Sequence, residues 1–222
     1  MIRDVLKNFT TEHRFAKAFH RNLADCDWTP HPRYSVFTQY DASFYVEQKE
    51  AFLHKYKCFW AVSKTIQPKR IVELGTHAGS SADAYLSATP TAHYVGVDKF
   101  CMDEDIRRED DGRRWQPLAV ANALFEARGF RNYEFISTNL RSLDTLPCKS
   151  DFVVVDAAHD FDNQYADMKL ALTAEPTFIF VDDVSGEAEQ AVNKFLAEDS
   201  DRVAFACPIE YVGGGSVIKM NT

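Results

Sequence analysis

Three aspartates end two apolar stretches in the second half of the chain. Asp156 follows the run DFVVV, and Asp182 and Asp183 follow TFIFV. Neighbouring strands lie about 4.8 Å apart, so side chains at the ends of two such strands can reach one ion. Adjacent residues of a regular strand point to opposite faces, so both Asp182 and Asp183 converge only if the chain already turns there. Carboxylates without cysteine predict Mg²⁺ or Mn²⁺; the alternative is that they cap the following loops.

A glycine-containing turn lies further back, in the stretch RIVELGTHAGSS that starts at Arg70. Gly75 and Gly79 allow a tight turn and close approach of the backbone to a ligand. No G-K-[ST] follows, and His77 occupies the place of the second glycine of a G-x-G-x-x-G motif. Glu73 would repel a pyrophosphate beside this turn. The pattern therefore predicts a ligand that carries positive charge, the alternative being a plain strand-to-helix turn.

A second carboxylate follows about twenty residues later. Asp98 ends the apolar run HYVGVD. An acidic residue at this position is well placed to accept both hydroxyls of a ribose. Together with Glu73 it predicts an adenosine ligand with a cationic part, and S-adenosylmethionine has an ammonium, a sulfonium and an adenosine.

The pattern of apolar runs predicts the elements that must position these residues. Apolar runs alternate with segments of helical spacing, which predicts an α/β fold with a doubly wound, mostly parallel sheet. Residues 202–220 read as two strands joined near Gly213, which would add an antiparallel edge and make seven strands in all. Residues 1–65 are expected to form a helical extension and residues 66–222 the cofactor-binding domain. The expected strands are 70–75, 93–98, 132–137, 151–156 and 177–183, and the expected helices are 43–66, 80–88, 116–129, 161–174 and 185–198.

The bulk composition disfavours several classes of partner. The 222 residues include 25 basic and 33 acidic side chains, for a net charge of −8. Such a surface is a poor one for nucleic acid and for anionic membranes. The five scattered cysteines and an N-terminus without an apolar leader segment indicate a cytoplasmic protein. A small-molecule substrate is expected, and the oligomeric state stays open, with a homo-oligomer allowed.

The combined motifs resemble a known family over about residues 66–220. VELGTHAGSS followed by YVGVD resembles the first two motifs of class I S-adenosylmethionine-dependent methyltransferases. VVVDAAHDFDNQYADMKLAL with FIFVDDV resembles a narrower branch, the metal-dependent O-methyltransferases similar to catechol O-methyltransferase and to macrolide sugar O-methyltransferases. The family's usual Pro-Gly-Gly before the last parallel strand is replaced here by the residues at 174–177, which reshapes that turn.

This resemblance implies roles for particular residues. The metal would bind two oxygens of the acceptor, and His159 would take the proton of the hydroxyl that is methylated. Asn139 would lie near the adenine. Trp115 and Gln116 end the charged loop 99–116, for which a solvated loop is favoured over a cover on the adenine. The candidate site residues are His159 as the base; Asp156, Asp182 and Asp183 as metal ligands; and Glu73, Gly75, Thr76, Gly79, Ser81, Asp98, Asn139 and Asp156 as cofactor contacts.

The expected reaction is methyl transfer from S-adenosylmethionine to a hydroxyl of a sugar, a catechol or a natural-product diol. One alternative is a nicotinamide-dependent oxidoreductase on a similar sheet, against which the missing middle glycine and Glu73 argue. Another is a catalytically silent nucleoside-binding module, which the presence of Asp156, His159 and the aspartate pair argues against.

Overall fold

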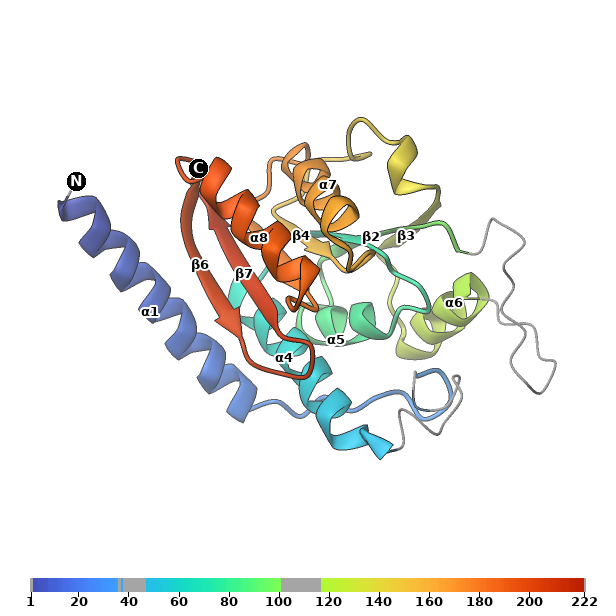
Figure 1. The fold of residues 1–222 in the computed structure, drawn as a ribbon. Helices are drawn as coiled ribbons and strands as arrows, with labels where there is room; N and C mark the ends of the chain where they lie inside the picture. The colour runs from blue at the N-terminus through green and yellow to red at the C-terminus, as the bar shows by residue number, and fades with distance from the viewer. Residues whose placement is uncertain (1, 36, 38–46, 101–116, 222) are drawn as a thin grey trace.

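The computed structural model describes residues 2–35, 37, 47–100 and 117–221 (Figure 1). Two helices precede the first strand, and strands and helices then alternate until two strands close the chain. The elements are α1 (Ile2–Ala24), α4 (Lys49–Ile66), β1 (Arg70–Leu74), α5 (Ser80–Ala88), β2 (His93–Asp98), α6 (Pro117–Arg128), β3 (Tyr133–Ser137), the 3-10 helix η1 (Leu140–Ser142), β4 (Phe152–Val155), α7 (Phe161–Leu172), β5 (Phe178–Asp182), α8 (Glu187–Glu198), β6 (Val203–Ile209) and β7 (Gly215–Met220).

The seven strands form one sheet in the order β3-β2-β1-β4-β5-β7-β6. β1 to β5 pair in parallel, whereas β7 is antiparallel to both β5 and β6. The predicted doubly wound sheet with an antiparallel C-terminal edge is therefore confirmed. The strand order reverses direction between β1 and β4, and ligands of such sheets bind outside the carboxyl ends of the strands at this switch point.

Helices cover both faces of the sheet, as Figure 1 shows, and each face has its own hydrophobic core. Alternate residues of each strand point to opposite faces, so Ile71 packs with α4 and α5 while Val72 packs with α7 and α8. The central strands are apolar at nearly every position because both of their faces are buried.

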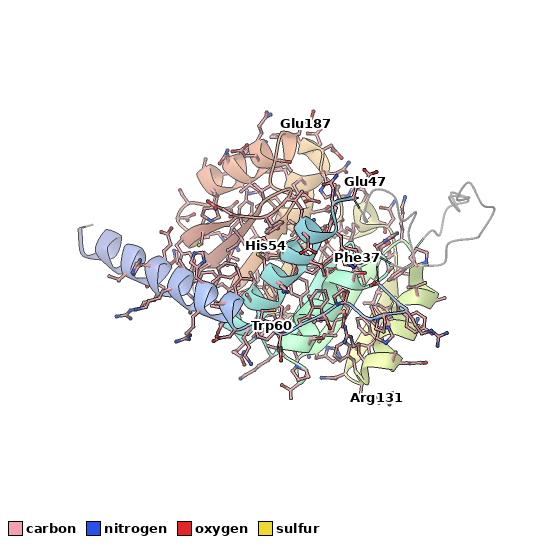
Figure 2. All side chains as sticks on the ribbon, turned by 90° about the horizontal axis from the view of Figure 1, so that it is seen from below. Phe37, Glu47, His54, Trp60, Arg131 and Glu187 are labelled. Carbon is pink, nitrogen blue, oxygen red and sulfur yellow. The ribbon has the colours of Figure 1, made fainter. Side chains whose placement is uncertain are left out.

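The N-terminal helices pack against the same body. α4 lies across the face that also carries α5, with Trp60 labelled on it in Figure 2, and Phe59 is fully buried between Tyr85 and Phe180. α1 runs along β6, where the ring centroid of Phe15 lies 5.7 Å from that of Phe205. α4 begins at Lys49, later than the expected start at 43, and residues 38–46 lie outside the described part of the chain.

None of the helices in the described ranges is both long enough and apolar enough to cross a membrane.

Candidate active site

Four of the predicted site residues meet at one edge of the sheet. Leu74 of β1 pairs with Val97 of β2 and with Val155 of β4, and Val155 pairs with Val181 of β5. The four parallel strands therefore end side by side. The residues that end these strands, or immediately follow them, are Gly75, Asp98, Asp156 and Asp182.

The turn after β1 needs a glycine for a reason that the sequence did not show. Gly75 has a φ of +92°, and a Cβ built on it would lie 2.2 Å from the carbonyl oxygen of Asp156 and 2.6 Å from the Cα of Ala157. The backbone that follows β4 occupies the space that a side chain at position 75 would need. This contact within the protein already requires a glycine there. Gly79, with a φ of +77°, is the N-cap of α5, and no side chain caps this helix with a hydrogen bond.

Glu73 carries a carboxylate that is completely buried within this turn. The hydroxyl of Tyr94 donates a hydrogen bond to its Oε2, while Oε1 has no hydrogen-bond partner among the described residues. Burial raises the pKa of Glu73 to about 7, and the nearby hydroxyls of Tyr94 and Ser81 offset only part of this effect. A buried carboxylate with a free oxygen suits a cationic group of a ligand.

Asp98 ties the end of β2 to the glycine turn. Its Oδ2 accepts a hydrogen bond of 2.8 Å from the backbone N–H of His77, and its Oδ1 accepts one of 2.7 Å from the N–H of Phe100. Each carboxylate oxygen can accept a second hydrogen bond. The carboxylate is thus held in a fixed orientation and keeps acceptor capacity for ribose hydroxyls.

The other predicted cofactor contacts are more weakly supported by the geometry. Thr76 is buried, and its hydroxyl is 3.0 Å from that of Tyr94 beneath the turn. Asn139 is exposed, and its side chain accepts a hydrogen bond from the N–H of Arg141 as the cap of η1. Ser81 is buried near the start of α5. The cofactor roles of all three stay predictions, and the charged loop with Trp115 and Gln116 lies almost entirely outside the described residues.

The three aspartates form an acidic cluster, defined here as Asp156, Asp182 and Asp183. Asp183 has a φ of 51°, so the chain does turn directly after β5 as the convergence of the two adjacent carboxylates requires. The turn packs against the loop before β7, because a Cβ on Gly213 would lie 2.0 Å from Oδ1 of Asp183. The pKa of Asp156 lies well above its usual range, since its carboxyl group is removed from water and faces Asp182.

Lys55 of α4 enters this cluster, which sequence reasoning did not anticipate. Its Nζ lies 2.7 Å from Oδ2 of Asp182 and 2.9 Å from Oδ1 of Asp183. Tyr211 completes the surroundings of Asp182 by donating a hydrogen bond of 2.6 Å to Oδ1. A signal for Lys55 existed in the sequence, since it lies on the same helical stripe as Phe52 and Phe59, where a buried cation needs a partner.

The electrostatics of Lys55 follow from this arrangement. Burial of the ammonium would lower its pKa, but the nearby carboxylates of Asp182, Asp156 and Asp183 outweigh burial and raise it above the ordinary value. Lys55 therefore stays protonated and gives the cluster one permanent positive charge.

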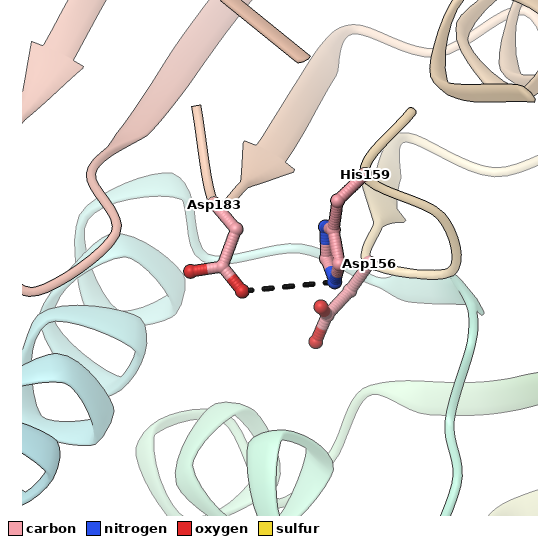
Figure 3. A group of neighbouring side chains, drawn as sticks. All are labelled: Asp156, His159 and Asp183. Atoms are coloured by element: carbon pink, nitrogen blue, oxygen red, sulfur yellow. Dashed lines mark ion pairs between the residues drawn. The ribbon is translucent and has the colours of Figure 1, made fainter. Parts of the chain in front are cut away.

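A second donor group lies beside the ion pairs and is drawn in Figure 3. Asp156, His159 and Asp183 each offer one ligand atom, and these atoms lie within 4.8 Å of one another. Nε2 of His159 is 3.8 Å from Oδ2 of Asp183. The two carboxylates suit a hard divalent cation such as Mg²⁺ or Mn²⁺, and the imidazole lies beside them. This group includes two of the three predicted metal ligands; Asp182 lies outside it and is instead bonded to Lys55 and Tyr211.

The comparisons with known proteins agree with this fold. No family model matches the chain, and no curated protein matches it either. Among solved structures, the methyltransferase PaMTH1 of Podospora anserina with bound S-adenosylhomocysteine is 18% identical, with a TM-score of 0.53 over 77% of this chain and 79% of that one. The O-methyltransferase TomG of Streptomyces achromogenes, in complex with S-adenosylmethionine, is 17% identical, with a TM-score of 0.53 over 77% and 81% of the two chains.

A methyltransferase from Geobacter sulfurreducens has a TM-score of 0.58 over 82% of this chain and 88% of its own, at 10% identity. Likeness at such low identity establishes the fold alone. The chain therefore has the fold of class I methyltransferases. This confirms the fold that the resemblance of the sequence motifs implied.

Proposed function

We propose that the protein is an S-adenosylmethionine-dependent O-methyltransferase that acts on a hydroxyl group of a small molecule such as a sugar, a catechol or a natural-product diol. The observation that carries this proposal is the single sheet edge at which the buried Glu73, the fixed Asp98 and the acidic cluster all lie. The cofactors bound to PaMTH1 and TomG support the choice of methyl donor.

The residues present fit this donor. The unpartnered Oε1 of Glu73 would receive its cationic amino group, and Asp98 would accept the ribose hydroxyls. When bound, S-adenosylmethionine supplies a methyl group activated by the positive charge on sulfur. The contribution of the protein is to align the acceptor oxygen with that methyl group, and such alignment accounts for a large share of the acceleration of a two-substrate reaction.

The acceptor would bind beside the donor group of Asp156, His159 and Asp183. Asp156 and Asp183 would hold Mg²⁺ or Mn²⁺, which supplies Lewis acidity that favours ionisation of the acceptor hydroxyl. We assign the imidazole of His159 to the proton of that hydroxyl, because its side chain is 53% exposed at the mouth of the site while the carboxylates lie deeper. The net charge of −8 favours a small acceptor over nucleic acid. A cytoplasmic location is proposed because the cysteines of the described residues are free thiols.

Calorimetric titration of S-adenosylhomocysteine tests the proposed donor. The wild type should bind, and Asp98→Ala should weaken binding by at least about tenfold, since a charge-assisted hydrogen bond contributes about 1.5–3 kcal/mol. Asp201→Ala is the control, because Asp201 is exposed and precedes β6 at the opposite edge of the sheet. Binding would justify a screen of hydroxyl acceptors with and without Mg²⁺. No binding to the wild type would contradict the proposal.

The affinity for S-adenosylhomocysteine should also depend on pH through Glu73. The pKa of Glu73 is raised from an ordinary 4.5 to about 7, so the ligand-free protein holds the proton below that pH. A cationic amino group favours the ionised carboxylate, and affinity should therefore rise as pH increases through about 7. The same shift means that the ligand-free protein gains stability as pH falls from above 7 towards 4.5.

Glu73→Gln is expected to remove both pH dependences. Titrations and urea unfolding at a series of pH values would measure them. An affinity for S-adenosylhomocysteine that stays constant across pH 7 in the wild type would argue against a contact between Glu73 and the amino group.

A further inference from the structure

Lys55 places its ammonium between two carboxylates of the acidic cluster. Its ammonium lies between Oδ2 of Asp182 and Oδ1 of Asp183, and only 9% of its side chain is exposed. The rings of Phe59 and Tyr211 each lie 5.7 Å from Nζ, so aromatic groups also stabilise the charge. The position of this ammonium is therefore determined by the fold and not by a mobile surface side chain.

Asp183 is shared between Lys55 and the candidate metal group. Its Oδ1 pairs with the ammonium and its Oδ2 faces His159, and Asp183 also belongs with Asp156 and His159 to the group of three possible ligands. A divalent cation held by Asp156 and Asp183 would thus share the carboxylate of Asp183 with the positively charged ammonium of Lys55. Like charges a few ångströms apart repel each other, and the repulsion grows as less water screens it.

We propose that Lys55 is the resident cation of the acidic cluster and that it opposes the binding of a divalent cation at Asp156 and Asp183. This inference rests on the metal site of the proposed function. It adds a residue that lowers the affinity of that site for a divalent cation. Without a divalent cation, Lys55 compensates the charges of Asp182 and Asp183 and keeps both carboxylates in place. With one, the ion competes with Lys55 for Asp183, so it binds weakly and exchanges readily.

Titration of Mn²⁺, followed by the electron paramagnetic resonance signal of the free ion, tests the inference on the full chain. Lys55→Met removes the charge and keeps an unbranched apolar stem among the aromatic rings. It should bind Mn²⁺ at least about tenfold more tightly than the wild type, because a repulsive charge beside the site is removed and the carboxylate of Asp183 loses its competing partner. Adding Asp156→Asn to this variant should abolish the gain.

The matched control is Lys64→Met, which removes a positive charge from the exposed end of the same helix. It should leave Mn²⁺ affinity unchanged. Lys55→Arg keeps the charge and should bind Mn²⁺ like the wild type. Circular dichroism would establish that each variant is folded, and if Lys55→Met is not, Lys55→Gln replaces it in the same titration with the same expected gain.

Equal or weaker Mn²⁺ binding by the neutral variant would overturn the inference. If neither protein bound Mn²⁺, the metal part of the proposed function would fail with it. Binding of S-adenosylhomocysteine, measured on the same samples, reports on the methyl donor site alone and so distinguishes these failures from a failure of the methyltransferase proposal.

Discussion

Replacing His159 by alanine should lower kcat by about a hundredfold, because a positioned general base contributes about 10²–10⁴ to the rate of a proton transfer. The imidazole is half exposed at the carboxyl edge of β4, 3.8 Å from the carboxylate of Asp183. Among the described residues, His159 makes no hydrogen bond to Glu73 or Asp98, the two residues expected to hold the cofactor. The affinity for S-adenosylhomocysteine should therefore stay within about twofold of the wild type, since Glu73 and Asp98, which would hold the amino group and the ribose, keep their own hydrogen bonds in this variant.

The measurement is steady-state kinetics with a hydroxyl acceptor found in the screen, alongside calorimetry of the same variant. His20→Ala on the exposed side of α1 is the control and should leave kcat unchanged. An unchanged kcat in His159→Ala would remove the base assignment and leave the methyl donor site intact.

Replacing Gly75 by alanine should destabilise the protein by about 3 kcal/mol or more. Part of this cost is the left-handed backbone, which disfavours any residue with a Cβ by about 1–2 kcal/mol. The rest is steric, because the new Cβ would lie 2.2 Å from the carbonyl oxygen of Asp156 and backbone cannot move aside as a flexible side chain can. The turn after β1 and the strand end that carries Asp156 would be forced apart.

Gly129→Ala provides a matched control for the backbone term. Gly129 has a positive φ of +77°, comparable to the +92° of Gly75, but a Cβ there meets no atom within 4 Å. Urea unfolding of both variants should show a loss of about 1–2 kcal/mol for Gly129→Ala and a clearly larger loss for Gly75→Ala. Equal losses would mean that the turn relaxes away from β4, and that the close packing of Gly75 on Asp156 does not restrict this position.

Local patterns were sufficient to predict the fold. Runs such as FVVV and FIFVD are apolar at consecutive positions because both faces of those strands are buried, and the intervening segments have helical spacing. Parallel strands joined by helices must cross over with one handedness, so the order of elements along the chain restricts the topology. Seven strands, the antiparallel closing pair and the sheet edge that holds Asp98, Asp156 and Asp182 were all predictable in this way.

The polar environment of that edge was decided by tertiary structure alone. Lys55 is 127 residues before Asp182, and its place on an apolar stripe indicates that it needs a partner but not that α4 brings the ammonium to 2.7 Å from this carboxylate. The same holds for Tyr94 with Glu73 and for Tyr211 with Asp182. Residue types and spacing determine which chemistry a strand end can offer. Which carboxylate stays free for a ligand and which is already paired depends on contacts between distant segments, because charge interactions follow distance in space and not position in the chain.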